Sequence, residues 1–390
     1  MEEFFMAKRG QGEGSISKRP DGTWWARITI GKTPEGKQKR KAFYGKTRKE
    51  VQEKLTAALN DLNNNTYIEP SKMTLEQWMY IWLRDYKKPS VKMKTYAAYE
   101  AQVKNHIIPE LGNYTLSALR NDMVQRFVNG LSDKGLNSLT VERIVGILKA
   151  ALVQAVDNGL IAKSPATRVK MPAPQERTPR VLTVPEQEVF MKAAKNHRNG
   201  EIFLLILGTG LRIGEALALT WNDIDFENAI LSVNRTQIEY CEHVNGETIY
   251  HRTYNSPKTK TSKRKIPLIP VLITMLLNLK TQREEEKQRF KDAYQDNNLI
   301  FCNYYGVSLS YSAISDKLHD ICKEADLEGV HPHTLRHTFA TRGLENGVEL
   351  KVMQELLGHS SIKMTADLYT HVLIETKQNS IMKLANTISF

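Results

Sequence analysis

The stretch His331-Pro-His-Thr-Leu-Arg-His-Thr-Phe-Ala340 predicts a helix with one buried face and one polar face. Leu335 and Phe339 are four residues apart and so share the apolar face. His333 and Arg336 are three residues apart and project from another face. The helix therefore holds a histidine and an arginine on a rigid platform.

A second motif, Gly208-Thr-Gly-Leu-Arg-Ile-Gly-Glu-Ala-Leu217, predicts a glycine-rich turn that places Arg212 at the start of a helix. The stretch lacks the Gly-Lys-Ser/Thr ending of a P-loop, which argues against nucleotide binding of that kind. Taken alone, an ordinary turn with a surface arginine is the commoner explanation.

Two further motifs lie near the C-terminus, with His359 in Leu356-Leu-Gly-His-Ser-Ser361 and Tyr369 in Asp367-Leu-Tyr-Thr-His371. Tyrosine is a poor nucleophile at its usual pKa of about 10, so it needs an electropositive surrounding. Planar guanidinium groups grip two oxygens of a phosphate and stabilise the charge that develops there. Cationic groups and a phenol without metal ligands point to phosphoryl transfer on a backbone phosphate.

Together the four motifs resemble the catalytic set of the tyrosine recombinases, the family of phage-lambda integrase. The resemblance rests on five residues, which are Arg212 in TGLRIGEALAL, His333 and Arg336 in HTLRHTFAT, His359 in LLGHSS and Tyr369 in LYTHV. With the basic module that precedes them, they are most similar to the integrases of conjugative transposons. The resemblance covers essentially the whole chain.

The resemblance implies a role for each residue. Tyr369 would attack a DNA phosphate and form a 3′-phosphotyrosine link, while Arg212 and Arg336 hold the phosphate. His359 would donate a further hydrogen bond, and His333 would assist proton transfer. One phosphate ester is exchanged for another, so no ATP, metal or other cofactor is expected.

The family also uses a lysine on a β-hairpin to protonate the leaving 5′-oxygen. Residues 256–268 offer Lys258, which matches the family's Lys-Thr step, and Lys260 as its rival. His337 lies close to His333 in angle around the predicted helix, so it is a rival candidate for the role of His333.

The expected fold is multidomain, mainly α with small β-sheets. Residues 1–66 should form a three-stranded sheet covered by one helix, an arm-site DNA-binding module. Residues 72–173 should form a four-helix, SAM-like core-binding domain, and residues 180–390 a mixed α/β catalytic domain. Four prolines make a polar linker, so this boundary is expected near 172–180.

The N-terminal module is strongly basic. Residues 1–66 carry 14 Lys plus Arg and 8 Asp plus Glu, a net +6 out of +12 for the chain. Candidate DNA-contact residues, with one from the later lysine run, are Trp24, Arg27, Lys39, Arg40, Lys41 and Lys260.

Two regions of the last domain have open interpretations. A β stretch is expected from 229 to 238, continuing at 266–268, with a hairpin at 238–251 that turns at Asn245-Gly246. The hairpin could be inert, or could touch DNA or a neighbouring subunit. Residues 370–390 carry an apolar stripe that packs either on the same chain or on a neighbour.

Composition sets the outer limits. The 390 residues are 41% hydrophobic and 25% charged, typical of folded protein rather than disorder. The positive charge favours a polyanionic partner, and no apolar run is long enough to span a bilayer. The three cysteines are scattered along the chain, so we expect neither disulfides nor a zinc site. The acidic N-terminus is unlike a signal peptide, so we expect a bacterial cytoplasmic, nucleoid-associated location.

The sequence thus predicts a site-specific recombinase of a mobile element that acts on double-stranded DNA at core sites and separate arm sites. It should work as a homo-oligomer, between dimer and tetramer, with an accessory directionality protein as a further partner. Two alternatives remain. A type IB topoisomerase would use similar chemistry as a monomer, and a DNA-binding regulator would have lost part of the catalytic set.

Overall fold

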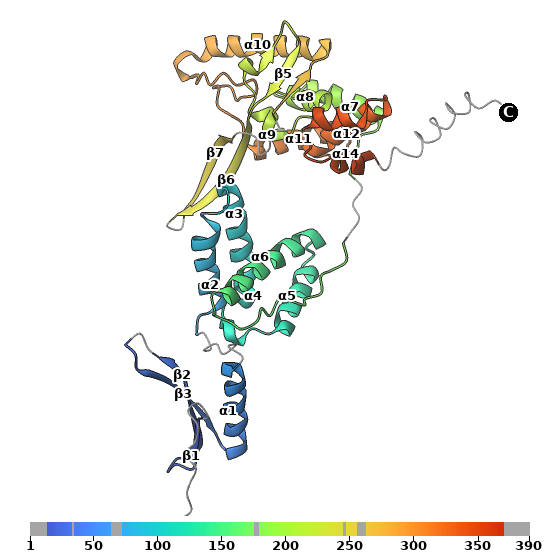
Figure 1. Ribbon diagram of the computed structural model, residues 1–390. Coiled ribbons are helices and arrows are strands. Elements are labelled where there is room, and N and C mark those ends of the chain that lie inside the picture. The colour runs from blue at the N-terminus through green and yellow to red at the C-terminus, as the bar shows by residue number, and fades with distance from the viewer. Residues whose placement is uncertain are drawn as a thin grey trace, which may run out of the picture. The chain divides into compact units, whose positions relative to one another are not determined.

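The computed structural model describes residues 14–32, 35–63, 72–174, 179–244, 247–255 and 263–369, with only the backbone given at 32, 243–244 and 367–369. By contacts, the chain separates into two compact units, Met1–Gln175 and Glu176–Phe390. Figure 1 labels many of the elements of both units. The predicted fold class, mainly helical with small antiparallel sheets, is confirmed.

The N-terminal module is an antiparallel sheet with one helix against it. Strands β1 (Ser15–Lys18), β2 (Trp24–Lys32) and β3 (Gln38–Gly45) lie in the order β1-β2-β3, followed by helix α1 (Arg48–Asn63). A small core of Ala26, Ile28, Val51 and Leu55 joins the sheet to the helix. The three-stranded sheet and covering helix were both predicted.

Four helical segments follow in the chain and share a hydrophobic core of their own. Their elements are α2 (Leu75–Ile81) with π-helix η1 (Trp82–Lys87), α3 (Met93–Gln102) with π-helix η2 (Val103–Ile107) and α4 (Ile108–Leu111), 3₁₀ helix η3 (Leu116–Ala118), α5 (Asn121–Asp133) and α6 (Ser138–Asp157). Aromatic side chains of α2 and η1 form part of this core, since Trp78 and Trp82 are each 2% exposed.

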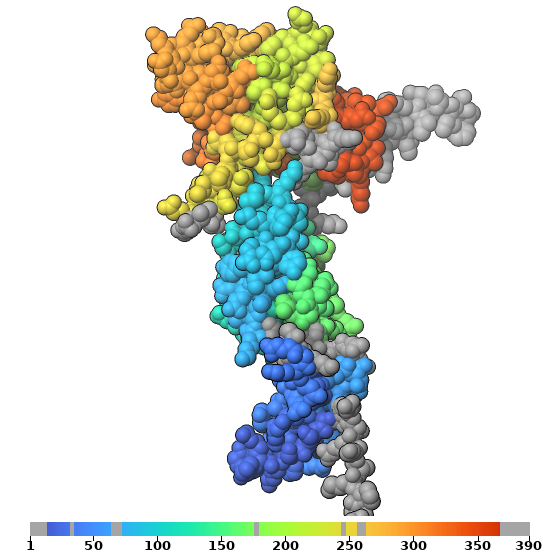
Figure 2. All heavy atoms as spheres, turned by 60° about the vertical axis from the view of Figure 1, so that its left-hand side comes forward, coloured from blue at the N-terminus to red at the C-terminus, as the bar shows by residue number. Residues whose placement is uncertain are grey.

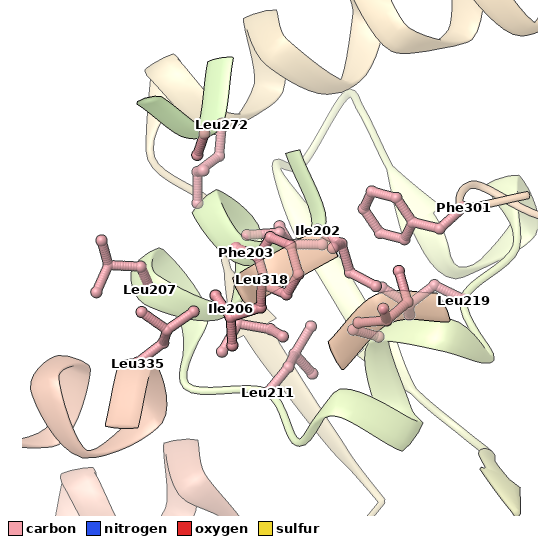
Figure 3. Close-up of a cluster of buried hydrophobic side chains, with 14 of the residues drawn as sticks. Ile202, Phe203, Ile206, Leu207, Leu211, Leu219, Leu272, Phe301, Leu318 and Leu335 are labelled. Atoms are coloured by element: carbon pink, nitrogen blue, oxygen red, sulfur yellow. The ribbon is translucent and has the colours of Figure 1, made fainter. Parts of the chain in front are cut away.

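The C-terminal unit surrounds helix α8 (Glu201–Thr209), which is apolar and buried on nearly every side. Around it lie α7 (Val184–Lys195), α9 (Ile213–Leu217), α10 (Pro270–Phe290), α11 (Tyr311–Glu324) and α12 (Pro332–Glu345). Leu318 of α11, Leu272 of α10 and Leu335 of α12 all join the cluster formed by α8 (Figure 3). The unit ends with α13 (Leu350–Leu357) and α14 (Ile362–Tyr369).

Two small sheets complete this unit, and here the sequence prediction was partly wrong. The expected continuous β stretch divides into β5 (Ile230–Val233), in a sheet of order β4-β5-β8, and β6 (Thr236–Val244), paired with β7 (Glu247–Asn255). The division falls at Asn234 and Arg235, whose side chains hydrogen-bond Asp223. The remaining elements are η4 (Trp221–Asp223), β4 (Ile224–Asp225), β8 (Arg264–Pro267) and η6 (Lys291–Ala293).

The predicted hairpin is longer than expected, because β6 and β7 pair from Thr236↔Asn255 to Val244↔Glu247. It protrudes from the body of the C-terminal unit, as Figures 1 and 2 both show. The expected Asn245-Gly246 turn lies outside the described residues.

One hydrogen bond in the helical core makes a direct stability test. The Trp78 indole N–H donates to the Ala151 carbonyl at 2.8 Å inside the core. Trp78→Phe should therefore lower the free energy of unfolding by about 1–2 kcal/mol more than Trp82→Phe, because it loses a buried hydrogen bond as well as volume. Denaturant unfolding of the full chain, followed by circular dichroism, measures both. Equal losses would mean that the hydrogen bond contributes nothing.

Candidate active site

Arg212 lies at the turn between α8 and α9. Helix α8 ends at Gly210, whose φ of +66° is left-handed, and a Cβ there would lie 2.5 Å from Phe339 Cδ1. The Arg212 Nη1 donates to Glu215 Oε1 at 2.9 Å, and its Nη2 donates to the Gly358 carbonyl at 3.2 Å. The glycine turn and these two bonds fix the predicted arginine in place.

Arg336 is buried in the centre of the site, with only 3% of the residue exposed. Its Nη1 donates to the Gly210 carbonyl at 2.5 Å and its Nη2 to the Leu357 carbonyl at 2.7 Å. Burial, together with the charge of Arg212, lowers the pKa of Arg336 to about 9. The side chain therefore stays protonated at neutral pH but is poorly compensated by the protein.

The C-terminal end of α13 brings the arginines together. Three consecutive carbonyls accept from three different guanidinium groups, Leu356 from Arg264 Nε at 2.6 Å, Leu357 from Arg336 and Gly358 from Arg212. The last carbonyls of a helix have no partner within it, and the negative end of the helix dipole favours cations. We call this set the arginine cap of α13.

Glu215 is a buried carboxylate beneath Arg212. It is 4% exposed, and Arg264 pairs with both of its oxygens, through Nη2 at 2.8 Å and Nη1 at 3.2 Å. Burial acts to raise the pKa of Glu215, but the hydrogen bonds and charges of Arg264 and Arg212 outweigh it and hold that pKa below its usual value. The pair Glu215–Arg264 was not predicted, although Glu215 follows Arg212 by three residues.

His359 follows the arginine cap directly and is 7% exposed. Its Nδ1 lies 2.9 Å from the hydroxyl of Thr365, which is fully buried on α14. Burial, then the charges of Arg336 and Arg212, lower the pKa of His359 to about 4. At neutral pH the ring is thus an uncharged donor and acceptor.

His333 and His337 lie one turn apart on α12, with ring centroids 6.1 Å apart. Desolvation by the surrounding protein, and then the charges of Arg336 and Arg212, lower the pKa of His333. His333 is exposed at the surface, whereas His337 is half-buried. Burial lowers the pKa of His337 to about 4, and its Nδ1 is buried with no hydrogen-bond partner among the described residues. His333 is thus the more accessible of the two rings.

The structure describes part of the predicted set. It places His333 and His359 close enough to Arg212 and Arg336 for the arginine charges to lower the pKa of both rings. Tyr369 is the last residue of α14, four residues after Thr365 and so on the same face of the helix backbone. The side chain of Tyr369, like Lys258 and Lys260, lies outside what is described.

The N-terminal sheet has a second cluster of basic and aromatic side chains. Trp25 stacks with Tyr44, with centroids 6.4 Å apart, and the Arg27 guanidinium lies 4.2 Å over the Trp25 ring. Arg40 pairs with Thr29 and so lies on this same face. We call this surface the outer face of the sheet.

The other predicted contact residues of the module lie on the opposite face. Trp24 packs against the hydrophobic core beneath the sheet, and Lys41 pairs with buried Ile28. By strand alternation Lys39 shares the face of Lys41. Trp25 is therefore the tryptophan of the outer face, and Trp24, a predicted DNA-contact residue, lies on the core side of the sheet.

The buried histidines predict a pH dependence of stability. His337 and His359 titrate near 4 in the folded chain and near 6.5 when unfolded, so the unfolded chain binds more protons between these values. As pH drops from about 6.5 to about 4.5, the free energy of unfolding should fall by about 2 kcal/mol for each histidine, or about 4 kcal/mol for the two together. Glu186, whose pKa is lowered to about 2 by Arg180, contributes only below about 4.5, its usual value.

Denaturant unfolding at pH 7.5 and pH 5 tests this. His337→Phe should be less sensitive to this change than the wild type, because the ring that must stay neutral is gone. If the free energy of unfolding of His337→Phe depends on pH as strongly as that of the wild type, then His337 binds a proton as readily in the folded chain as in the unfolded chain.

Two further findings concern metal ions and membranes. No group of three or more His, Cys, Asp or Glu suited to a metal ion occurs among the described residues. None of the described helices is long and apolar enough to cross a membrane.

Comparison with known proteins agrees with this geometry. Residues 180–375 match the phage integrase family, and residues 74–132 match the phage integrase N-terminal SAM-like domain. The chain is 35% identical over 369 residues to a XerC-like tyrosine recombinase of Caldanaerobacter subterraneus subsp. tengcongensis, covering 92% of this chain and 94% of that protein. It is 25% identical to the transposase from transposon Tn916 of Enterococcus faecalis, covering 86% of this chain and 83% of that protein.

Solved structures show the same fold. The Tn1549 transposon integrase in complex with a circular intermediate DNA has a TM-score of 0.66 and 22% identity over 80% of this chain and 100% of that one. A lambda integrase dimer bound to a COC′ core site has a TM-score of 0.56 and 19% identity over 93% and 96%. With a family match to half of the chain and a relative similar along nearly its whole length, the chain belongs to the phage integrase family of tyrosine recombinases.

Proposed function

We propose that this enzyme is the site-specific recombinase of a mobile element, which cuts and rejoins DNA through a 3′-phosphotyrosine intermediate. One observation carries the proposal: Arg212 and Arg336 converge on the end of α13, which leads directly into α14 and Tyr369. Similarity to the Tn916 transposase and to the Tn1549 integrase supports a mobile element of the conjugative transposon class.

The arginines would hold the scissile phosphate. Each terminal nitrogen of Arg336 carries two hydrogens, and the carbonyls of Gly210 and Leu357 each take one. The remaining N–H groups are available to phosphate oxygens, and the poor compensation of the buried charge favours an anion there. The Arg212 side chain is 33% exposed and is the more accessible of the two.

Neutral His359 would add a third donor. If the Thr365 hydroxyl donates to Nδ1, the proton of the ring lies on Nε2, where it can hydrogen-bond a phosphate oxygen. The phenolic oxygen of Tyr369 then forms a bond to phosphorus as the bond from phosphorus to the 5′-oxygen breaks. His333 assists removal of the phenol proton, and Lys258, with Lys260 as its rival, supplies a proton to the 5′-oxygen.

We propose three domains, at residues 1–66, 72–173 and 180–390. The proposed DNA substrates follow from this division of the chain. The last two would hold a core site, and the outer face of the N-terminal sheet would read a separate arm site. A lambda integrase is known as a dimer on a core site and as a tetramer on a Holliday junction. We propose similar assembly for this chain, an accessory directionality protein, and action at the nucleoid in the cytoplasm.

The nucleophile provides the first test. Tyr369→Phe removes only the phenolic oxygen, so it should keep DNA binding and abolish the covalent complex with nicked DNA carrying the element ends. Denaturing gel electrophoresis of the labelled DNA measures trapping, and a mobility shift measures binding. Trapping that survives the substitution would end the assignment of Tyr369.

The outer face provides the second test. The double variant Trp25→Ala/Arg27→Ala should weaken arm-site binding by about tenfold or more, because it removes a stacking ring and a cation, and should leave core-site cleavage intact. Lys37→Ala, at an exposed turn of the same module, is the matched control. Loss of core cleavage together with arm binding would contradict the proposed division of labour.

A further inference from the structure

Arg264 differs from the basic residues around it in the lysine-rich stretch that leads into β8. Its side chain is 6% exposed, whereas Lys263 and Lys265 on either side are exposed. Its Nε donates to the Leu356 carbonyl at 2.6 Å, and its two terminal nitrogens donate to the two oxygens of Glu215. Arg264 therefore faces the protein interior, and a role in holding DNA phosphate does not fit.

Glu215 connects Arg264 to Arg212. Its Oε1 accepts from Nη1 of both arginines, and its Oε2 accepts from Arg264 Nη2 and from the Arg212 backbone N–H. One carboxylate thus lies between two cations and carries a pKa that favours its charged form. Glu215 alone would neutralise Arg212, while the second cation leaves the site with a net positive charge.

We infer that Arg264 is a positioning residue for Arg212. It holds Glu215 in a fixed orientation, cancels most of the carboxylate's charge, and ties β8 to the end of α13 through Leu356. If Arg264 is lost, Glu215 is free to form a two-pronged pair with Arg212, which turns that guanidinium away from the phosphate and reduces its field. The inference rests on the proposed role of Arg212 in phosphate binding.

A double-mutant cycle tests the coupling. Arg264→Gln should lower the rate of covalent complex formation at saturating DNA by about 10²-fold, as loss of a transition-state donor does, with little change in DNA affinity. In the Arg212→Lys background the same change should cost less than about threefold, because the residue that it positions is already impaired. Arg264→Lys, which keeps the charge but loses the fork, should show the same pattern more weakly.

Arg283→Gln is the matched control. Arg283 is also a buried arginine, 4% exposed, that pairs with a carboxylate, Glu286, and with a carbonyl, Ile300. Its loss should reduce stability comparably, and whatever effect it has on the rate should be the same with and without Arg212→Lys. This control separates a general cost of breaking a buried ion pair from a specific effect on Arg212.

A substrate with an uncharged methylphosphonate at the cleavage site gives an independent readout. Removing the phosphate charge removes the need for a cation, so the defect of Arg264→Gln relative to wild type should shrink on this substrate, as should that of Arg212→Lys. Independent effects of Arg264 and Arg212 in the cycle, with an equal defect on both substrates, would overturn the inference. If Arg264→Gln fails to fold, Arg264→Lys decides by the same two criteria.

The proposed function fails on a different result. If the wild-type enzyme forms no covalent complex, or if Tyr369→Phe still forms one, the catalytic assignment is wrong whatever Arg264 does. If the wild-type enzyme cleaves through Tyr369 but Arg264 acts independently of Arg212, the proposed function still holds. Only the positioning role of Arg264 would then be wrong.

Discussion

The unsatisfied carbonyls at the end of α13 are the constraint on which the site depends. Three of them in succession need partners, and arginines from β8, from α12 and from the turn after α8 supply them. These arginines come from distant parts of the chain, since Arg212 and Gly358 are 146 residues apart. One helix end therefore sets where several elements of the domain meet, and the cations gather there as a consequence.

This solution concentrates positive charge in a poorly solvated place. Among the described residues, Arg336 hydrogen-bonds two neutral carbonyls and no carboxylate. Burial and the charge of Arg212 lower its pKa, so the protein compensates the buried charge of Arg336 only in part. A site with this imbalance is less stable than it could be, but it is ready for an anion before one arrives. Catalysis by preorganised donors requires this arrangement, and a more complete pairing of Arg336 would stabilise the fold while weakening that readiness.

Local patterns were predictable where neighbours in sequence decide the outcome. The helical spacing of Leu335 and Phe339 and the glycine turn before Arg212 both appear as expected. The sequence did not show which tryptophan of the Trp24-Trp25 pair faces outward, because both choices alternate equally well until the helix covers one face. Nor did it show the Glu215–Arg264 pair, which joins residues 49 positions apart and depends on where β8 meets α9.

The same helix end also links the arginines to the proposed nucleophile, Tyr369. Gly358 adopts a left-handed φ of +64° that ends α13, and His359 follows it into contact with Thr365 on α14. Residues 365 and 369 lie about one turn apart on α14. The backbone of Tyr369 is therefore on the same face of the helix as Thr365, which contacts His359. The charges of Arg336 and Arg212 would repel a charged imidazole near them, and with a pKa of about 4 His359 is uncharged at neutral pH. A neutral His359 can therefore lie close to the arginines and still contact Thr365 on α14, the helix that ends at the proposed nucleophile.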